Sequence, residues 1–252
     1  GTFTNGSITV GGQGSGHSLV VSNGSACANT LTVFSSANVF LNGGNSDALY
    51  VDSFSGSSSA SSFITGTVAG ASSQVIAGWL NGSSTVNPIL AGNLALTKVG
   101  TGTLTLANNA NSYAGGTTIK AGAISVSSAT QLGTNAVTLG DSVAGADATL
   151  QVTANVTIAN NISVAAGTGG RILSGNSAAN TTTLLGNVTL NTNLTVSKSG
   201  GDLVMSGAFA GTGSITNGGS GYVYWSGPSS TNWTGNLVIT AGTIAQGGQL
   251  TS

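Results

Sequence analysis

The fold of this chain is decided by residues 96–140, which read LTKVGTGTLTLANNANSYAGGTTIKAGAISVSSATQLGTNAVTLG. Short segments of alternating apolar and hydroxyl-bearing residues are separated here by turns rich in Gly, Asn and Ser. Leu104 and Leu106 face one side of such a segment, while Thr103 and Thr105 face the other. Each segment is too short to bury a core alone, so copies must stack on one another, as they do in a β-solenoid.

The same alternation predicts which side chains lie in the core. Residues two apart in a strand share a face, so apolar residues at this spacing turn inward if the intervening Thr and Ser face water. The core residues predicted in this way are Leu104, Leu106, Ile124, Val126, Val137, Leu139, Leu150 and Val152.

Residues 96–133 also resemble the autotransporter-associated β-strand repeat of bacterial surface and secreted proteins. The resemblance depends on several glycines, one aromatic residue and two strand pairs that follow in order. The matching pieces are LTKVGTGTLTL (96–106), Asn111, Tyr113, GGTTI (115–119), AGAISV (121–126) and QLG (131–133). The resemblance implies a passenger-type β-helix outside the cell, and it brings no catalytic residue with it.

Two weaker copies of this repeat follow. A looser copy at residues 215–244 reads ITNGGSGYVYWSGPSSTNWTGNLVITAGTI, with Trp233 in the place of Tyr113. A trace at residues 197–207 reads SKSGGDLVMSG. No part of the chain shows the apolar periodicity of a helix, and Glu is absent. We therefore expect an all-β fold, a right-handed β-solenoid (β-helix) of stacked short strands.

Asparagine residues are expected at the corners of the solenoid. Asn tolerates positive φ more readily than most residues, and its amide can bond to the next turn of the chain. The candidates are Asn160, Asn161, Asn176, Asn180, Asn187 and Asn191.

Residues 1–92 are less regular, and a soft boundary is expected near Gly92. Aromatic residues concentrate in this part, and a Ser-rich stretch at residues 53–62 interrupts it. Two interpretations stay open. One is a continuous solenoid with irregular early turns, and the other is a sandwich-like, β-rich N-terminal region followed by a solenoid of residues 93–252.

The chain is almost uncharged. Charged residues make up 4% of it and the net charge is −1, whereas roughly 25% is usual for a soluble protein. Four scattered cations cannot form a basic groove, so nucleic acid is not an expected partner. No apolar run reaches the length of about 18 residues that a membrane-spanning helix requires. Little electrostatic repulsion opposes self-association.

Candidate catalytic groups are few. Asp47 with Asp52, and Asp141 with Asp147, are the acidic pairs that could serve glycoside hydrolysis. Both pairs lie in loops of Gly, Ser and Asn, where Asp is an ordinary turn former, so a structural role is favoured. His17 has no second His and no nearby Asp to orient it. We expect no catalytic residue and no enzyme.

No cofactor or metal site is expected either. The acidic residues are too sparse for a calcium loop. The stretch GGQGSG at residues 11–16 lacks the Lys and the helix of a phosphate-binding loop. The single Cys27 is interpreted as a small buried hydrophobe, with an intermolecular disulfide as the alternative.

Two classes of extracellular or cell-surface function remain. The first is a structural protein that assembles with copies of itself. The second is an adhesin passenger that binds a host surface or carbohydrate. The second would use a sugar-stacking strip of Tyr222, Tyr224, Trp225 and Trp233. Alternatively, Trp225 caps the core while the tyrosines lie on the outer face.

The terminal segments favour the structural class. Neither residues 2–10 nor residues 237–245 show the capping helix or the charged residues that usually protect a solenoid edge. Such edges could pair head to tail and give a filament or layer. The assembly strands expected on this basis contain Thr2, Phe3, Ile8, Val10, Leu237 and Ile239. The chain is therefore expected to be either a piece of a longer passenger or a mature protein whose ends are covered by neighbouring copies.

Overall fold

The chain folds almost entirely into short β-strands. The structure is a computed structural model, and it describes residues 6–12, 16–43, 47–55, 62–68, 73–143, 145–175, 180–228 and 232–246. Across these ranges the one helical element is a single 3₁₀ turn, η2 (Ala129–Leu132). The described residues contain no helix that is long and apolar enough to cross a membrane. The expected all-β solenoid of stacked strands is confirmed.

The chain divides into two compact units. Unit 1 comprises residues 1–118 and 130–135, and unit 2 comprises residues 119–129 and 136–252. The strand β12 (Thr117–Ile119) and the turn η2 lie at the two places where the division crosses the sequence. Gly92 lies inside unit 1, at the end of a strand.

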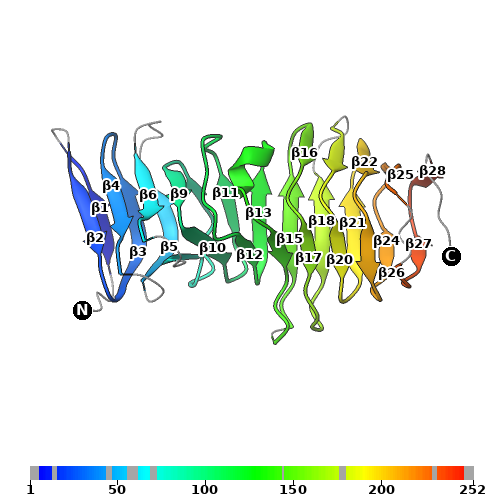
Figure 1. Cartoon of the computed structure of the whole chain (residues 1–252), viewed down its shortest axis with the longest axis horizontal. Coiled ribbons are helices and arrows are strands. Elements are labelled where there is room, and N and C mark those ends of the chain that lie inside the picture. The colour runs from blue at the N-terminus through cyan, green and yellow to red at the C-terminus, as the bar shows by residue number, and fades with distance from the viewer. Residues whose placement is uncertain are drawn as a thin grey trace. The chain divides into compact units, whose positions relative to one another are not determined.

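Unit 1 is a winding of parallel strands (Figure 1). One sheet contains, in order, β1 (Ser7–Val10), β3 (Ser25–Val33), β5 (Ala48–Ser55), β7 (Ser73–Ala77) and β10 (Leu94–Lys98). A second contains β2 (Ser18–Val21), β4 (Asn38–Leu41), β6 (Phe63–Gly66) and β9 (Ile89–Gly92). The strands β8 (Ser84–Val86) and β11 (Thr103–Leu106) also pair in parallel. The described strands between residues 7 and 92 pair in parallel, as the strands of later turns do.

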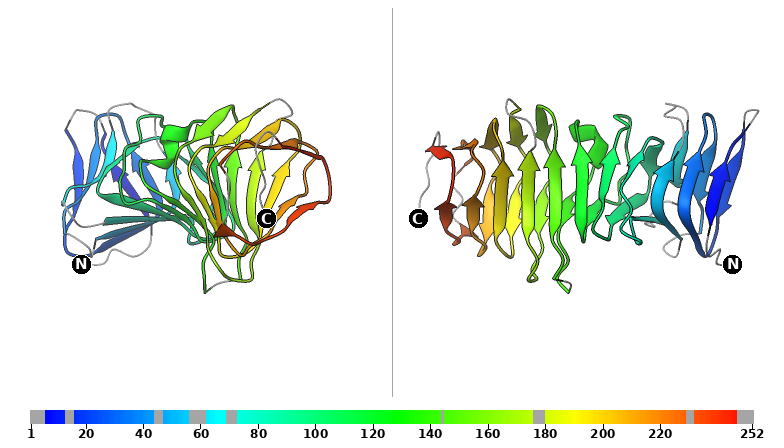
Figure 2. Two further views of the ribbon diagram at one scale, coloured as in Figure 1. Left: turned by 45° about the vertical axis from the view of Figure 1, so that its right-hand side comes forward. Right: turned by 180° about the vertical axis from the view of Figure 1, so that it is seen from behind.

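Unit 2 contributes one strand from most turns to each of three sheets (Figure 2). The first holds β13 (Gly122–Val126), β15 (Ala148–Val152), β18 (Arg171–Gly175), β21 (Leu194–Lys198), β24 (Ile215–Asn217) and β27 (Leu237–Ile239). The second holds β14 (Val137–Leu139), β17 (Ile162–Val164), β20 (Val188–Leu190), β23 (Phe209–Gly211) and β26 (Asn232–Trp233). The third holds β16 (Val156–Ile158), β19 (Thr182–Leu184), β22 (Asp202–Met205), β25 (Tyr222–Trp225) and β28 (Thr243–Gln246).

Successive turns stack with equivalent residues in line. Leu150 of β15 pairs with Ile124 of β13 on one side and with Leu173 of β18 on the other. All three side chains are at most 3% exposed. A shift of the register by two residues would keep each side chain on the same face of the sheet but would separate these apolar partners. The stacked apolar residues therefore fix the register of neighbouring strands.

The predicted core is confirmed residue by residue. Every one of the eight predicted side chains is at most 2% exposed. Thr103 and Thr105, which alternate with them in β11, are partly exposed. Ser125 in β13 differs from its expected outward position in that it is only 7% exposed. The short strands therefore bury a continuous apolar column only because they are stacked.

The corner asparagines act through their side-chain amides. Asn161 Oδ1 accepts a hydrogen bond from Asn187 N at 2.9 Å, and Asn187 Oδ1 accepts one from Ala208 N at 3.1 Å. The predicted bonding between turns is thus confirmed for Asn161 and Asn187. The predicted positive φ is wrong for the described candidates, because the described non-glycine residues with positive φ are Asn23, Ser36 and Asn81. Asn176 lies outside the described residues.

Candidate functional site

The first acidic pair of the sequence analysis supports the backbone of unit 1. Asp47 is 1% exposed, and its carboxylate accepts hydrogen bonds from Gly24 N at 3.1 Å and from Gly43 N. Asp52 Oδ1 accepts bonds from Leu80 N at 2.6 Å and Gly82 N at 3.0 Å. Carboxylates bonded in this way fix loops that come from different turns of the chain.

The second acidic pair does the same in unit 2. Asp147 Oδ1 accepts a hydrogen bond from Gly170 N at 2.6 Å. Asp141 accepts one from Val143 N at 3.0 Å, and its Oδ2 lies 3.4 Å from Lys120 Nζ. The Val143 N–H lowers the pKa of Asp141 most, with Lys120 and Arg171 acting in the same direction. A carboxylate held ionised in this way is a poor general acid.

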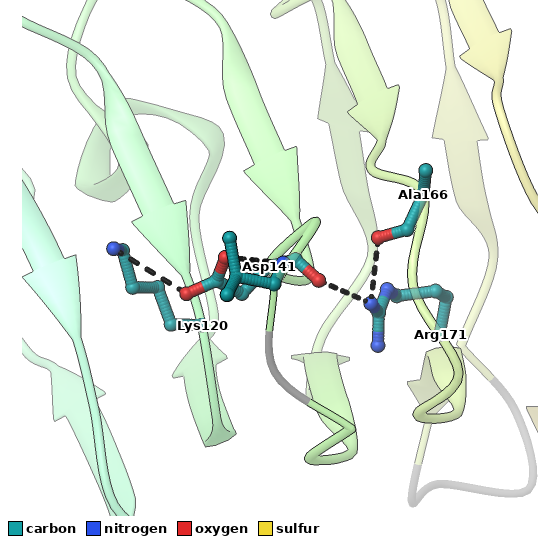
Figure 3. Close-up of polar contacts among 5 residues, drawn as sticks. Lys120, Asp141, Ala166 and Arg171 are labelled. Carbon is teal, nitrogen blue, oxygen red and sulfur yellow. Dashed lines mark hydrogen bonds and ion pairs between the residues drawn. The ribbon is translucent and has the colours of Figure 1, made fainter.

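Arg171 is buried among main-chain carbonyls and was missed by the sequence analysis. It is 1% exposed. Its Nη2 donates to Asp141 O at 2.9 Å and to Ala166 O at 3.1 Å (Figure 3). Its other nitrogens reach further carbonyls, those of Ala146, Ala165, Gly169 and Gly170. The guanidinium therefore joins the loop between β14 and β15 to the loop between β17 and β18.

Lys98 occupies a comparable position in unit 1. Its side chain has no exposed surface, and Nζ donates to Val99 O at 2.5 Å and to Gly100 O at 2.9 Å. Burial lowers the pKa of Lys98 to about 8, although nearby Asp52 acts against this shift. The ammonium group closes the turn that follows β10.

Lys198 repeats this arrangement in unit 2. Its Nζ donates to Asn180 O at 2.8 Å, Thr182 Oγ1 at 2.9 Å and Asp202 O at 2.9 Å. Burial lowers the pKa of Lys198, and the charge of Asp202 opposes this shift.

The sequence contains a signal for all three buried cations, because each of them continues an alternation of inward apolar residues. Lys98 follows Leu94 and Leu96, Lys198 follows Leu194 and Val196, and Arg171 precedes Leu173.

The aromatic residues near the end of unit 2 fall into two groups. Trp225 is fully buried, with its ring centroid 4.5 Å from that of Phe209 and 5.3 Å from that of Trp233. Trp233 is partly exposed, and its Nε1 donates to Gly213 O at 2.8 Å. The burial of Trp225 excludes it from a sugar-stacking strip and fits the alternative that it fills the core.

The two tyrosines lie on the opposite face of the same strand. Tyr222 is 49% exposed and Tyr224 is partly exposed. Their ring centroids are 5.9 Å apart, and the ring planes differ by 22°. Of the four aromatic residues proposed from the sequence, this pair presents ring surface to solvent side by side.

The strands expected to serve assembly are only partly described. Thr2 and Phe3 lie outside the described residues. Ile8 is partly exposed, whereas Val10 is 5% exposed and belongs to the core. Leu237 is partly exposed, and Ile239 is 54% exposed.

The other side chains that could react or bind a metal, among them His17 and Cys27, form no cluster among the described residues. Within the described ranges, no three His, Cys, Asp or Glu residues lie close enough together to hold a metal ion. His17 is exposed in a loop. Cys27 is a free thiol and is partly exposed in β3, so the prediction that it is buried is wrong. It sits at an outward position between Ala26 and Ala28, which take the inward positions.

Comparison with known families agrees with this architecture. The family model of the passenger-associated-transport-repeat matches residues 96–126. This range contains most of the motif pieces quoted above, and the resemblance to the autotransporter repeat is confirmed. The chain thus belongs to the class of repeat-bearing β-solenoids. More particularly, residues 96–126 are similar to the passenger-associated-transport-repeat, and the stacked strands fit an autotransporter passenger-type β-helix repeat protein.

The similarity to this repeat bears on where the protein is found and on whether it is an enzyme. The repeat is that of passengers, which are secreted or carried at the cell surface, and such β-helices are generally non-catalytic. Comparison with curated proteins gave no match, and neither did comparison with solved structures.

Proposed function

We propose that this chain is a structural, non-enzymatic length of β-solenoid in an extracellular surface protein. The observation that carries this proposal is that the charged side chains form hydrogen bonds to the main chain. Asp47, Asp52 and Asp147 accept main-chain N–H bonds. Lys98, Lys198 and Arg171 donate to main-chain carbonyls. Groups that could do chemistry instead hold the turns together, as expected of a scaffold.

Two measurements test the scaffold role. Antibody against the chain should label intact cells of the source organism, and labelling only after permeabilisation would contradict an extracellular location. Purified protein should not turn over a panel of polysaccharides. Turnover that disappears in Asp47→Asn, Asp52→Asn, Asp141→Asn or Asp147→Asn would show that the acids are catalytic.

The finer form of this proposal is head-to-tail self-assembly into a filament or layer. Each sheet is built by parallel main-chain pairing, which does not depend on charge, and the net charge is −1. The outermost strand of a sheet can pair equally with a further turn of one polypeptide or with a strand of another copy. Pairing between different surfaces of successive copies grows an open fibre.

Sedimentation and negative-stain microscopy of the 252-residue chain test this form. Fibres should appear as concentration rises, and deletion of residues 1–10 should leave monomers. A full-length chain that stays monomeric at high concentration would contradict self-assembly while leaving the scaffold role intact. The second candidate, an adhesin, is favoured by the exposed pair of Tyr222 and Tyr224.

A further inference from the structure

The outer face of β25 carries an aromatic surface that the scaffold does not need. Tyr222 and Tyr224 point outward, while Val223 and Trp225 between and beyond them are at most 1% exposed. Neither tyrosine hydroxyl forms a hydrogen bond with another residue that the structure describes. Both phenol groups are therefore available to a ligand.

The strands on either side supply polar and small residues in line with the rings. Tyr222 pairs with Asp202 of β22 and with Thr243 of β28. Tyr224 pairs with Val204 and Ala245 in the same two strands. Since paired residues of neighbouring strands share a face, the rings are flanked by a carboxylate, a hydroxyl and two small apolar side chains. We call Tyr222, Tyr224, Asp202 and Thr243 the tyrosine platform.

Core side chains and strand pairing hold the backbone of the tyrosine platform in place. Trp225 packs against the buried Phe209 and the partly exposed Trp233, and Leu203 and Met205 of β22 have no exposed surface. β25 is paired along its length with β22 and β28. A surface whose backbone and supporting side chains are already fixed loses little entropy when it binds.

The charge of this face selects the ligand. None of the strands β16, β19, β22, β25 and β28 contains Lys or Arg, and Asp202 places a carboxylate beside the rings. The ammonium group of Lys198 donates to Asp202 O but is buried, so these strands offer an anionic glycan or an acidic peptide no exposed cation. A neutral pyranose chain offers flat C–H faces to the rings and hydroxyl groups to Asp202 and Thr243.

We infer that the tyrosine platform is a binding site for a neutral polysaccharide built of flat, equatorially substituted pyranoses. Tyr222 and Tyr224 stack against the sugar rings, and Asp202 accepts hydrogen bonds from sugar hydroxyl groups. The site lies on the flat outside of a sheet, so it takes an extended chain along its length rather than a chain end. This inference stands apart from the scaffold role, which survives if the platform binds nothing.

Titration calorimetry with cellohexaose and chitohexaose tests the inference on the full chain. At least one of the two should bind, and Tyr222→Ala should weaken its association constant by at least about tenfold, a common loss when an anchoring aromatic residue is truncated. Tyr222→Phe keeps the ring and should stay within about threefold of the unmodified protein. Heparin, the anionic probe, should not bind.

A matched control separates binding from folding. Tyr50 is a partly exposed tyrosine in β5, outside the platform, so Tyr50→Ala should leave the association constant unchanged. Circular dichroism of each variant checks that the strands are intact. Absence of binding to both sugars at millimolar concentration overturns the inference. So does equal binding by the folded Tyr222→Ala, Tyr224→Ala double variant. If that double variant instead abolishes self-association of the chain, the platform is a contact between copies and the sugar site is wrong.

Discussion

The guanidinium of Arg171 fills the space that a side chain on Gly140 would occupy. Gly140 follows β14 with a φ of +103°, and its N–H donates to Ile119 O at 2.8 Å. Arg171 begins β18, and its Nη2 donates to the carbonyl of Asp141, the neighbour of Gly140. A glycine that looks like a simple turn residue is therefore required for the insertion of a buried cation.

Gly140→Ala should destabilise the protein by about 3 kcal/mol, because the new methyl group displaces a buried guanidinium and strains the backbone. Chemical denaturation followed by circular dichroism measures the change. Gly218→Ala is the control, since the nearest atom to a methyl group there would be at 3.6 Å, an ordinary contact. Equal stability of the two variants would show that Arg171 moves aside without loss.

Arg171→Met should lower the free energy of unfolding by about 2–4 kcal/mol, because several carbonyl groups lose their donor. Arg171→Lys should lose less stability than Arg171→Met, because its ammonium group keeps three of the five N–H donors of the guanidinium. The same denaturation experiment ranks the two variants. A methionine variant as stable as the unmodified protein would mean that water replaces the guanidinium at these carbonyls.

Leu106→Ala should cost about 2–5 kcal/mol, as expected for a cavity in a packed core. Leu106 is 1% exposed and pairs with Val86 of the neighbouring turn. Thr105→Ala in the same strand is the matched control, because Thr105 is partly exposed. The stacking interpretation fails if the threonine variant loses as much stability as the leucine variant.

Stability should rise with pH between about 8 and 10. The pKa of Lys98 is about 8 in the folded protein against an ordinary value of 10.5, so the unfolded chain binds more protons in this window. Lys198 acts in the same direction. Above pH 10 the trend should reverse, because burial raises the pKa of Tyr113 above its ordinary value of 10.0 and the unfolded chain loses that proton first.

Denaturation midpoints across this pH range check the prediction. Lys98→Met should reduce the rise between pH 8 and 10, and Tyr113→Phe should reduce the fall above it. Stability that is flat over the whole range would show that Lys98 remains charged, with its nitrogen solvated, in the folded state.

The sequence by itself determined the class of fold and the core. Alternation of apolar and hydroxyl residues with a period of two can be satisfied only by strands, and strands of three to five residues bury a core only by stacking. The burial of Leu104, Ile124 and Leu150 could therefore be predicted from the sequence alone. The repeat motif was equally visible, because its glycines and Tyr113 occur in a fixed order.

Tertiary structure alone decided where the polar groups go. Asp147 and Gly170 are far apart in the sequence, yet stacking brings the carboxylate to the amide of the following turn. The inward direction of Lys98 follows the strand alternation, but its stability depends on carbonyl groups that only the closed turn provides. Trp225 and Tyr224 are neighbours in sequence, and the strand sends one ring into the core and the other to solvent. Composition and spacing specify local periodicity, whereas hydrogen bonds between turns depend on which residues of successive turns the fold brings side by side.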